Sequence, residues 1–211
     1  MRTALFLATA ICMNGSIIGC GSSPPSTFYA LSPENGASHP APVRTLKLRR
    51  PGLAGYLDRP EIVRRVIDHR LGVVDTDRWA SPLDEMLARV LAQDIEQRLQ
   101  GSLVFTEDGA ITADADLTIE IDLRRFDIGE GGEVNLVAEV ALEKGDNHEP
   151  AGMRTVNLRV APNSASTPAL LGAMSVLVGQ LADEIGALAR ATSATPSVLG
   201  ENTVPGSSRM R

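Results

Sequence analysis

Apolar and polar residues alternate along several segments of this chain, and a period of two is typical of β-strands with one buried face. Within residues 43–49, Leu46 and Leu48 face one way while their polar neighbours face the other. Further extended segments follow at 62–66 and 68–74. The pattern therefore predicts two or three strands in the first part of the chain.

Three longer strands are predicted in the second half, at 117–128, 134–142 and 153–160. Glycine-containing turns separate them, so consecutive strands are expected to pair as an antiparallel meander. The alternation slips by one position at Arg124 and Arg125. A β-bulge explains such a slip.

Two other segments carry apolar residues at helical spacing. The first begins at Ser81 and Pro82, a capping residue followed by proline at the first helical position, and ends at Gly101. The second runs from Thr167 to about Arg190. The apolar stripe of the first is Leu83, Met86, Leu87, Val90, Leu91, Ile95 and Leu99, and that of the second is Leu170, Met174, Leu177, Val178, Leu181, Ile185 and Leu188.

These elements predict an α+β fold, with a mainly antiparallel sheet and two amphipathic helices packed on one face. Residues 43–191 are expected to form this domain. Residues 192–211 are rich in Ser, Thr, Pro and Gly and predict a disordered tail.

The N-terminus has the layout of a lipoprotein signal. A positive start and an apolar run from Ala4 to Met13 precede the residues Ile17 to Cys20, which resemble a lipobox. The run is shorter than the roughly 20 residues that cross a bilayer. We predict a signal peptide at 1–19 and a lipid on Cys20; an ordinary signal peptide that contains a cysteine is the alternative.

The lipid on Cys20 sets the expected location. Several acyl chains, such as palmitate, hold a protein on a membrane where one chain is marginal. Residues 20–42 are expected to form the lipidated N-terminus and tether. Gly21 stands where Asp would retain a lipoprotein in the inner membrane of enteric-type bacteria. We therefore expect the periplasmic face of the outer membrane.

Composition and charge exclude several functions. A net charge of -6 and the lack of a dense Lys/Arg cluster argue against binding to nucleic acid or to anionic lipid through a polybasic patch. The two cysteines, Cys12 and Cys20, both lie in the N-terminal segment. The domain therefore has neither a disulfide framework nor a cysteine-based zinc site.

No catalytic grouping stands out in the sequence. Glycine-rich residues 129–132 lie between two strands, which predicts a hairpin turn and not a phosphate cradle. Asp114 and Asp116 would share a strand face and could hold a cation, but such residues more often solubilise a strand. The histidines are isolated in sequence: His39, His69 and His148. We predict a non-enzymatic protein with no metal and no cofactor except the covalent lipid.

The most specific motif of the chain is Tyr56-Leu57-Asp58-Arg59-Pro60-Glu61-Ile62-Val63-Arg64-Arg65. Phe28-Tyr29-Ala30-Leu31 precedes it, and Trp79-Ala80-Ser81-Pro82-Leu83 follows and opens the helix that contains Arg89-Val90-Leu91. In order and spacing, from about Cys20 to Arg190, the chain resembles the PqiC/YmbA-type lipoproteins. These are auxiliary components of ABC-type transport systems of the MCE family.

The resemblance implies a non-enzymatic outer-membrane subunit of an intermembrane lipid transport system, one that supports membrane integrity. Its partner would be the MCE-domain protein that spans the periplasm. The subunit would receive the end of that protein and assemble as a ring-like homo-oligomer.

Residue chemistry leaves two roles open for the motif. Tyr56 and Trp79 are amphipathic aromatic residues of the kind that anchor interfaces, but they also fit at the edge of a core. Pro60 fixes a turn, and Asp58 can cap that turn while pairing with Arg59 or Arg64. The motif therefore serves the fold, the assembly or both.

Two other classes of function are alternatives. A periplasmic lipid-binding carrier lipoprotein would hold lipid in an internal apolar cavity, of which the small and medium aliphatic residues give no sign. A hydrolase would require convergent carboxylates or histidines, and the sequence offers no such cluster.

Overall fold

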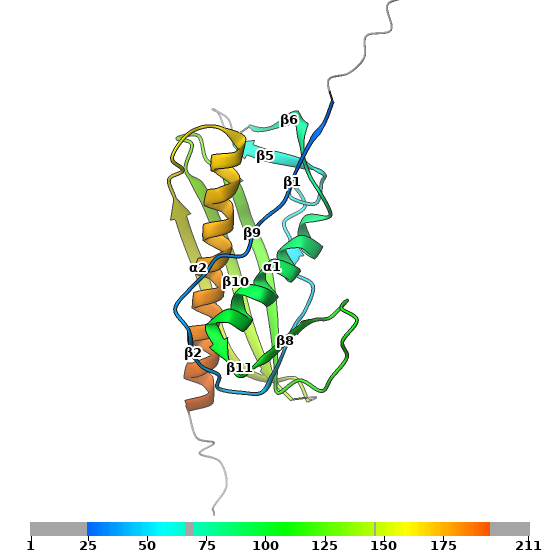
Figure 1. Ribbon diagram of the computed structural model, residues 1–211, viewed down its shortest axis with the longest axis vertical. Coiled ribbons are helices and arrows are strands. Elements are labelled where there is room, and N and C mark those ends of the chain that lie inside the picture. The colour runs from blue at the N-terminus through cyan, green and yellow to red at the C-terminus, as the bar shows by residue number, and fades with distance from the viewer. Residues whose placement is uncertain (1–24, 66–69, 146, 195–211) are drawn as a thin grey trace, which may run out of the picture.

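Two helices lie across one face of a β-sheet, and the apolar core fills the space between these layers (Figure 1). The computed structural model describes residues 25–65, 70–145 and 147–194. The predicted signal peptide, Cys20 and residues 195–211 of the predicted tail lie outside the described residues, as does His69. The predicted α+β class is confirmed.

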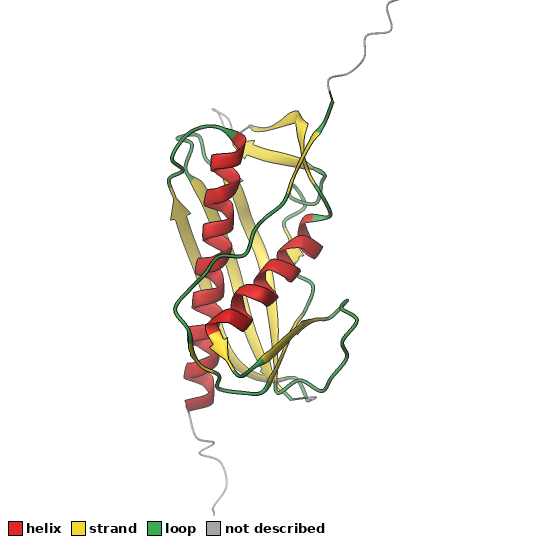
Figure 2. Cartoon of the chain, in the orientation of Figure 1, coloured by secondary structure: helices red, strands yellow, loops and turns green. Residues whose placement is uncertain are grey.

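Most elements of the described chain are strands, with one helix after the first six strands and one after the last strand (Figure 2). The helices are α1 (Leu83–Arg98) and α2 (Thr167–Ala194). The strands are β1 (Thr27–Tyr29), β2 (His39–Pro40), β3 (Thr45–Leu48), β4 (Gly52–Leu53), β5 (Glu61–Arg65), β6 (Leu71–Trp79), β7 (Leu99–Gln100), β8 (Leu103–Thr106), β9 (Leu117–Ile128), β10 (Val134–Lys144) and β11 (Glu149–Val160).

The main sheet has nine strands within the described residues, while β2 and β7 pair separately. It is mixed, so the prediction of a mainly antiparallel sheet is wrong. Parallel pairs join β3 to β8 and β9, β4 and β5 to β9, and β1 to β6. A parallel pair needs a crossover of a dozen or more residues. The long connections between these strands, several of which contain α1, provide such crossovers.

Strands β9, β10 and β11 form the predicted antiparallel meander. The bulge also lies where the alternation slips. Val137 pairs with Arg125 and Ala138 pairs with Leu123, which leaves Arg124 as the extra residue. The bulge returns the apolar residues after it to the core face of β9.

The turn between β9 and β10 is a hairpin turn, as predicted. The Gly132 N–H donates to the Gly129 carbonyl at 3.0 Å, and the Gly129 N–H donates to the Glu133 carbonyl at 2.7 Å. Gly132 has a φ of 84°. Because this turn leads into a strand, it presents no helix N-terminus to a phosphate group.

Helix α2 is the core helix of the domain. It is long and apolar enough to cross a membrane, yet 67% of its apolar window is buried within the fold. The strand face beneath the helices is buried too, at Val134, Leu136, Ala138, Val140 and Leu142 of β10. Packing between these two surfaces therefore accounts for the apolar composition of α2.

Both helices differ from the prediction in extent. Helix α1 ends at Arg98 and not at Gly101, and Leu99 and Gln100 form β7 instead. Ser81 does not cap α1: the N-cap is Pro82, and the Ser81 hydroxyl instead accepts a hydrogen bond from Arg89 at 3.0 Å. Helix α2 continues to Ala194, so residues 192–194 of the predicted disordered tail are helical, and the Thr192 hydroxyl donates to the Ala189 carbonyl at 3.0 Å.

Candidate functional site

Residues 56–60, which we call the motif loop, connect β4 to β5 beside the end of β6. The Trp79 N–H donates to the Pro60 carbonyl at 2.8 Å. Pro82 follows at the start of α1. The structure thus brings together the motif residues that are separated by about twenty positions in the sequence.

The motif loop has a buried part and an exposed part. Leu57 is 2% exposed and Trp79 is 5% exposed, and both belong to the apolar core. Asp58, Arg59 and Pro60 are exposed. The first group serves the fold, and the second is free to contact another molecule.

A surface pocket of about 330 Å³ lies between the motif loop and the start of α1. Its lining residues are Asp58, Arg59, Pro60, Trp79, Ser81, Pro82 and Leu83. Apolar side chains lie next to one acidic and one basic residue, a combination that suits a side chain or short segment of a protein partner.

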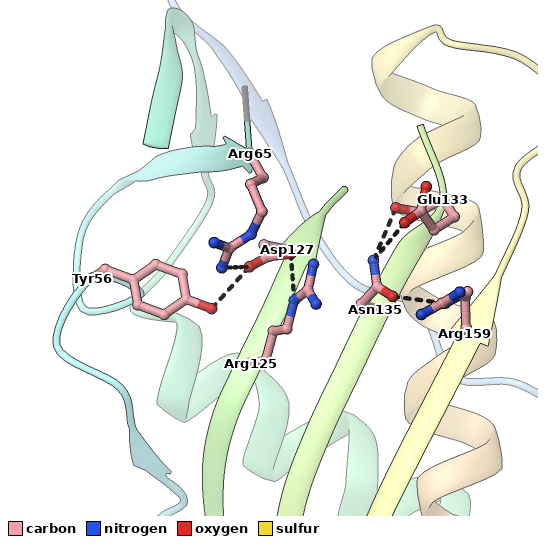
Figure 3. A network of polar contacts seen from close by, with 7 residues as sticks. All are labelled: Tyr56, Arg65, Arg125, Asp127, Glu133, Asn135 and Arg159. Carbon is pink, nitrogen blue, oxygen red and sulfur yellow. Dashed lines mark hydrogen bonds and ion pairs between the residues drawn. The ribbon is translucent and has the colours of Figure 1, made fainter. Parts of the chain in front are cut away.

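Behind the motif loop, a fully buried carboxylate holds it to the sheet (Figure 3). The Tyr56 hydroxyl donates to Asp127 Oδ2 at 3.1 Å. Arg65 Nη2 donates to the same oxygen at 3.0 Å, and Arg125 Nε donates to Asp127 Oδ1 at 2.9 Å. Asp127 on β9 therefore joins the motif loop, β5 and its own strand.

Burial and charge around Asp127 affect its partners. Desolvation of the half-buried phenol raises the pKa of Tyr56 to about 12, and the nearby Asp127 carboxylate adds to this effect. The hydrogen bond to Asp127 raises the pKa of Arg65. Tyr56 therefore stays a neutral donor and Arg65 stays charged, so the cluster holds the loop in place at neutral pH.

The polar contacts continue across the neighbouring strands (Figure 3). Arg159 Nε on β11 donates to Asn135 Oδ1 on β10 at 3.0 Å. The Asn135 amide lies 3.5 Å from a carboxylate oxygen of Glu133. The pKa of Glu133 is lowered, first by a hydrogen bond from its own backbone N–H and then by Asn135. These contacts connect the strand ends next to the Asp127 cluster.

Sequence reasoning did not single out Asp127, Arg65 or Arg125. Arg65 lies at the end of the quoted motif without an assigned role. One signal was present: after the bulge, Arg125 and Asp127 are two positions apart on one strand and so share a face. The contact between Arg65 and Asp127 depends on the parallel pairing of β5 with β9, which the sequence pattern does not reveal.

The carboxylate pair considered in the sequence is not a joint site. Asp116 accepts backbone hydrogen bonds from Arg44 and Thr45, each at 2.9 Å, and these lower its pKa. Asp114 is exposed nearby. Asp116 therefore ties the start of β9 to β3.

The remaining histidines do not converge. His39 lies on β2, and His148 lies in the β10–β11 turn with Nδ1 at 2.7 Å from Glu143. Within the described residues, no group of three or more His, Cys, Asp or Glu side chains is placed to hold a metal ion.

The family of ABC-type transport auxiliary lipoprotein components has a sequence model that matches residues 29–186. This range contains the motif loop, Asp127 with its three partners Tyr56, Arg65 and Arg125, and most of α2. No curated protein matches the chain.

Solved structures share this fold. A Xanthomonas campestris protein described with the family DUF330 is 22% identical, covers 79% of this chain and 96% of its own, and has a TM-score of 0.66. A second, an uncharacterized protein, is 18% identical, covers 78% of this chain and 98% of its own, and has a TM-score of 0.65. At these identities the likeness extends to the fold alone.

Proposed function

Because the chain belongs to the family of ABC-type transport auxiliary lipoprotein components, we propose that it is a non-enzymatic subunit of an intermembrane lipid transport system. In this proposal Cys20 carries the lipid, and the domain sits at the periplasmic face of the outer membrane. Its partner is the MCE-domain protein, and its assembly is a ring-like homo-oligomer. Through these contacts it supports membrane integrity.

The family match over residues 29–186 is the observation that carries the proposal. It covers almost all of the described domain, so the relation concerns the whole fold and not one shared motif. A non-enzymatic role is also consistent with the engagement of Asp116 and Asp127 in contacts that hold strands and loops.

The exposed half of the motif loop is our candidate for the docking contact. Asp58, Arg59 and Pro60 are exposed beside a pocket, while Tyr56 and Leu57 hold the loop from below. A loop fixed in this way loses little conformational entropy when a partner binds. This favours the motif loop over a flexible segment as a recognition surface.

The carrier alternative gains no support from the core. The apolar residues between the sheet and the helices pack as one cluster, with side chains such as Leu87, Leu136 and Leu177 wholly buried. A lipid held inside the domain would need to displace this packing.

The anchor is tested by labelling cells with radioactive palmitate and separating the two membranes. The full-length chain is expected to carry label and to fractionate with the outer membrane. The Cys20→Ala chain should carry none. Label on neither chain, or recovery of both in the same fraction, would overturn the anchor.

The docking contact is tested by capturing a tagged full-length chain from envelope membranes. Wild type is expected to bring down an MCE-domain protein. The variant with Asp58→Asn and Arg59→Gln keeps the net charge and should lose most of that protein. A matched control, Arg44→Gln with Asp114→Asn, changes two exposed residues elsewhere and should capture as wild type does. Equal capture by all three would exclude the motif loop.

A further inference from the structure

Several large apolar side chains are exposed at the end of the domain where the described chain begins. Phe28 on β1 is 65% exposed, and Leu71 and Val73 on β6 are 43% and 37% exposed. A single exposed apolar side chain is common on soluble proteins. Phe28 pairs with Arg78 of β6, while Leu71 and Val73 lie on the part of β6 that pairs with β5. Three such side chains on neighbouring strands of one sheet call for an explanation.

Strands β1, β5 and β6 lie together at this end of the molecule, and the last turn of α2 lies at the opposite end (Figure 1). A hydrogen bond between β6 and α2 agrees with this arrangement. Asp77 of β6 accepts a hydrogen bond at 2.7 Å from Thr167, the first residue of α2. With 28 residues, α2 extends about 42 Å from there.

Residues 25–42 of the predicted tether pack on the domain, with β1 in the main sheet and Leu31 in the core, so the length of chain left between Cys20 and the domain is short. Four residues lie between Cys20 and Pro25, the first described residue, so five Cα–Cα steps join the two. A fully extended chain covers at most about 3.6 Å per residue, so Cys20 lies within about 18 Å of Pro25. This reach is less than half the length of α2, so a lipid on Cys20 holds the β1–β6 end close to the bilayer.

The chemistry of this end suits a lipid headgroup region. Arg70 is exposed next to Leu71. Two carboxylates near these residues are engaged within the fold: Glu61 lies 3.5 Å from Arg78, and Asp77 accepts a hydrogen bond from Thr167. Apolar side chains beside a guanidinium are typical of surfaces that rest in the interfacial layer of a membrane.

We propose that the end formed by β1, β5 and β6 rests on the membrane, with Phe28, Leu71 and Val73 in the headgroup region and Arg70 at a lipid phosphate. The surface is defined by these four residues, and we call it the membrane-facing end. The opposite end, with the C-terminus of α2, then points away from the bilayer. This inference rests on the proposed lipid anchor at Cys20.

The cysteine content of the chain allows a direct test. Cys12 and Cys20 are its two cysteines. Once the signal peptide is removed and Cys20 is acylated, an introduced cysteine is the only free thiol. Lipidated variants with Phe28→Cys or Val73→Cys are labelled at the new thiol with an environment-sensitive fluorophore. They are then incorporated into vesicles of phosphatidylethanolamine and phosphatidylglycerol. Met153→Cys on β11, where Met153 is 74% exposed, is the matched control.

Labels at positions 28 and 73 are expected to shift to shorter emission wavelength on vesicles and to be quenched by lipids brominated near the headgroup. The label at 153 should do neither. If the chain floats with the vesicles but labels at 28 and 73 behave like the control, the membrane-facing end is wrong and the anchor stands. A shift without quenching by brominated lipid would assign this surface to another protein chain and would also overturn the inference. If the chain does not float, the anchor fails and the inference fails with it.

Discussion

Replacing Asp127 by alanine removes the carboxylate that Tyr56, Arg65 and Arg125 share. Two guanidinium groups then lose their counter-charge at the edge of the core. Each is 30% exposed and gains some water, so we expect a loss near the lower end of the range for broken buried pairs, about 3 kcal/mol. Urea unfolding measures this difference.

Tyr56→Phe provides the comparison, because it removes one hydrogen bond and keeps the ring. It is expected to reduce the free energy of unfolding by about 1–2 kcal/mol. Combining the two variants should cost less than the sum of the single losses, since the Tyr56 hydroxyl binds Asp127 itself. Additive losses, or less than 1 kcal/mol for Asp127→Ala, would contradict the role assigned to the cluster.

Asp94 on α1 predicts a pH dependence of stability. Its side chain is fully buried, its Oδ1 accepts the Glu34 N–H at 2.8 Å, and Oδ2 has no hydrogen-bond partner. Burial raises the pKa of Asp94 to about 6, against the opposing effects of the Glu34 backbone N–H and of Arg98. The carboxylates of Glu34 and Asp183 also raise it.

The folded-state pKa of Asp94 therefore lies above the unfolded value of about 3.9. The folded state binds the proton more tightly, so this residue favours folding at low pH, and that contribution is lost as pH rises from about 4 to about 6. Asp94→Asn removes the titration. Relative to wild type, the variant should gain about 2–3 kcal/mol across this window. Unfolding curves at several pH values test this, and a difference that does not change with pH would refute it.

At the scale of elements, replacing Gly132 tests how much the turn of the β9–β10 hairpin contributes to stability. A Cβ at Gly132 would meet open space. The backbone of Gly132, however, has a φ of 84°, a conformation that residues with a side chain adopt only at a cost in free energy. Gly132→Ala is expected to lower the free energy of unfolding by about 1–2 kcal/mol. Gly55→Ala also meets open space, without the positive φ, and should change stability by less than about 1 kcal/mol. Thermal unfolding compares the two, and equal effects would show that the turn does not need glycine.

Hydrophobic periodicity in the sequence reveals some helices and strands of the fold and misses others. The meander, its bulge and both helices follow from hydrophobic periodicity, because each is defined by local alternation. The short strands β1 and β4 do not, because two or three residues carry too little alternation to be recognised. Parallel pairs are set by distant segments, so the meeting of Arg65 with Asp127 was not predictable. Of the candidate site, the motif loop and Trp79 were identified from sequence, and their attachment to β9 was not.

At the scale of the whole molecule, the proposed docking contact and the proposed membrane contact involve different residues. The exposed motif residues lie beside the start of α1, whereas Phe28, Leu71 and Val73 lie on β1 and β6. We expect Arg59→Gln to weaken partner capture without changing the lipid quenching of a label at position 73. Phe28→Ser should do the opposite. Loss of both properties in either variant would mean that the two surfaces are one.

In the proposed function, the chain fixes one end of a transport path to the outer membrane. The most direct measurement is the distribution of the MCE-domain protein between separated inner and outer membranes. With the wild-type chain, a fraction of that protein should sediment with the outer membrane. With an unanchored Cys20→Ala chain carrying an ordinary cleavable signal, that fraction should be lost. An unchanged distribution of the MCE-domain protein would rule out this role for the chain.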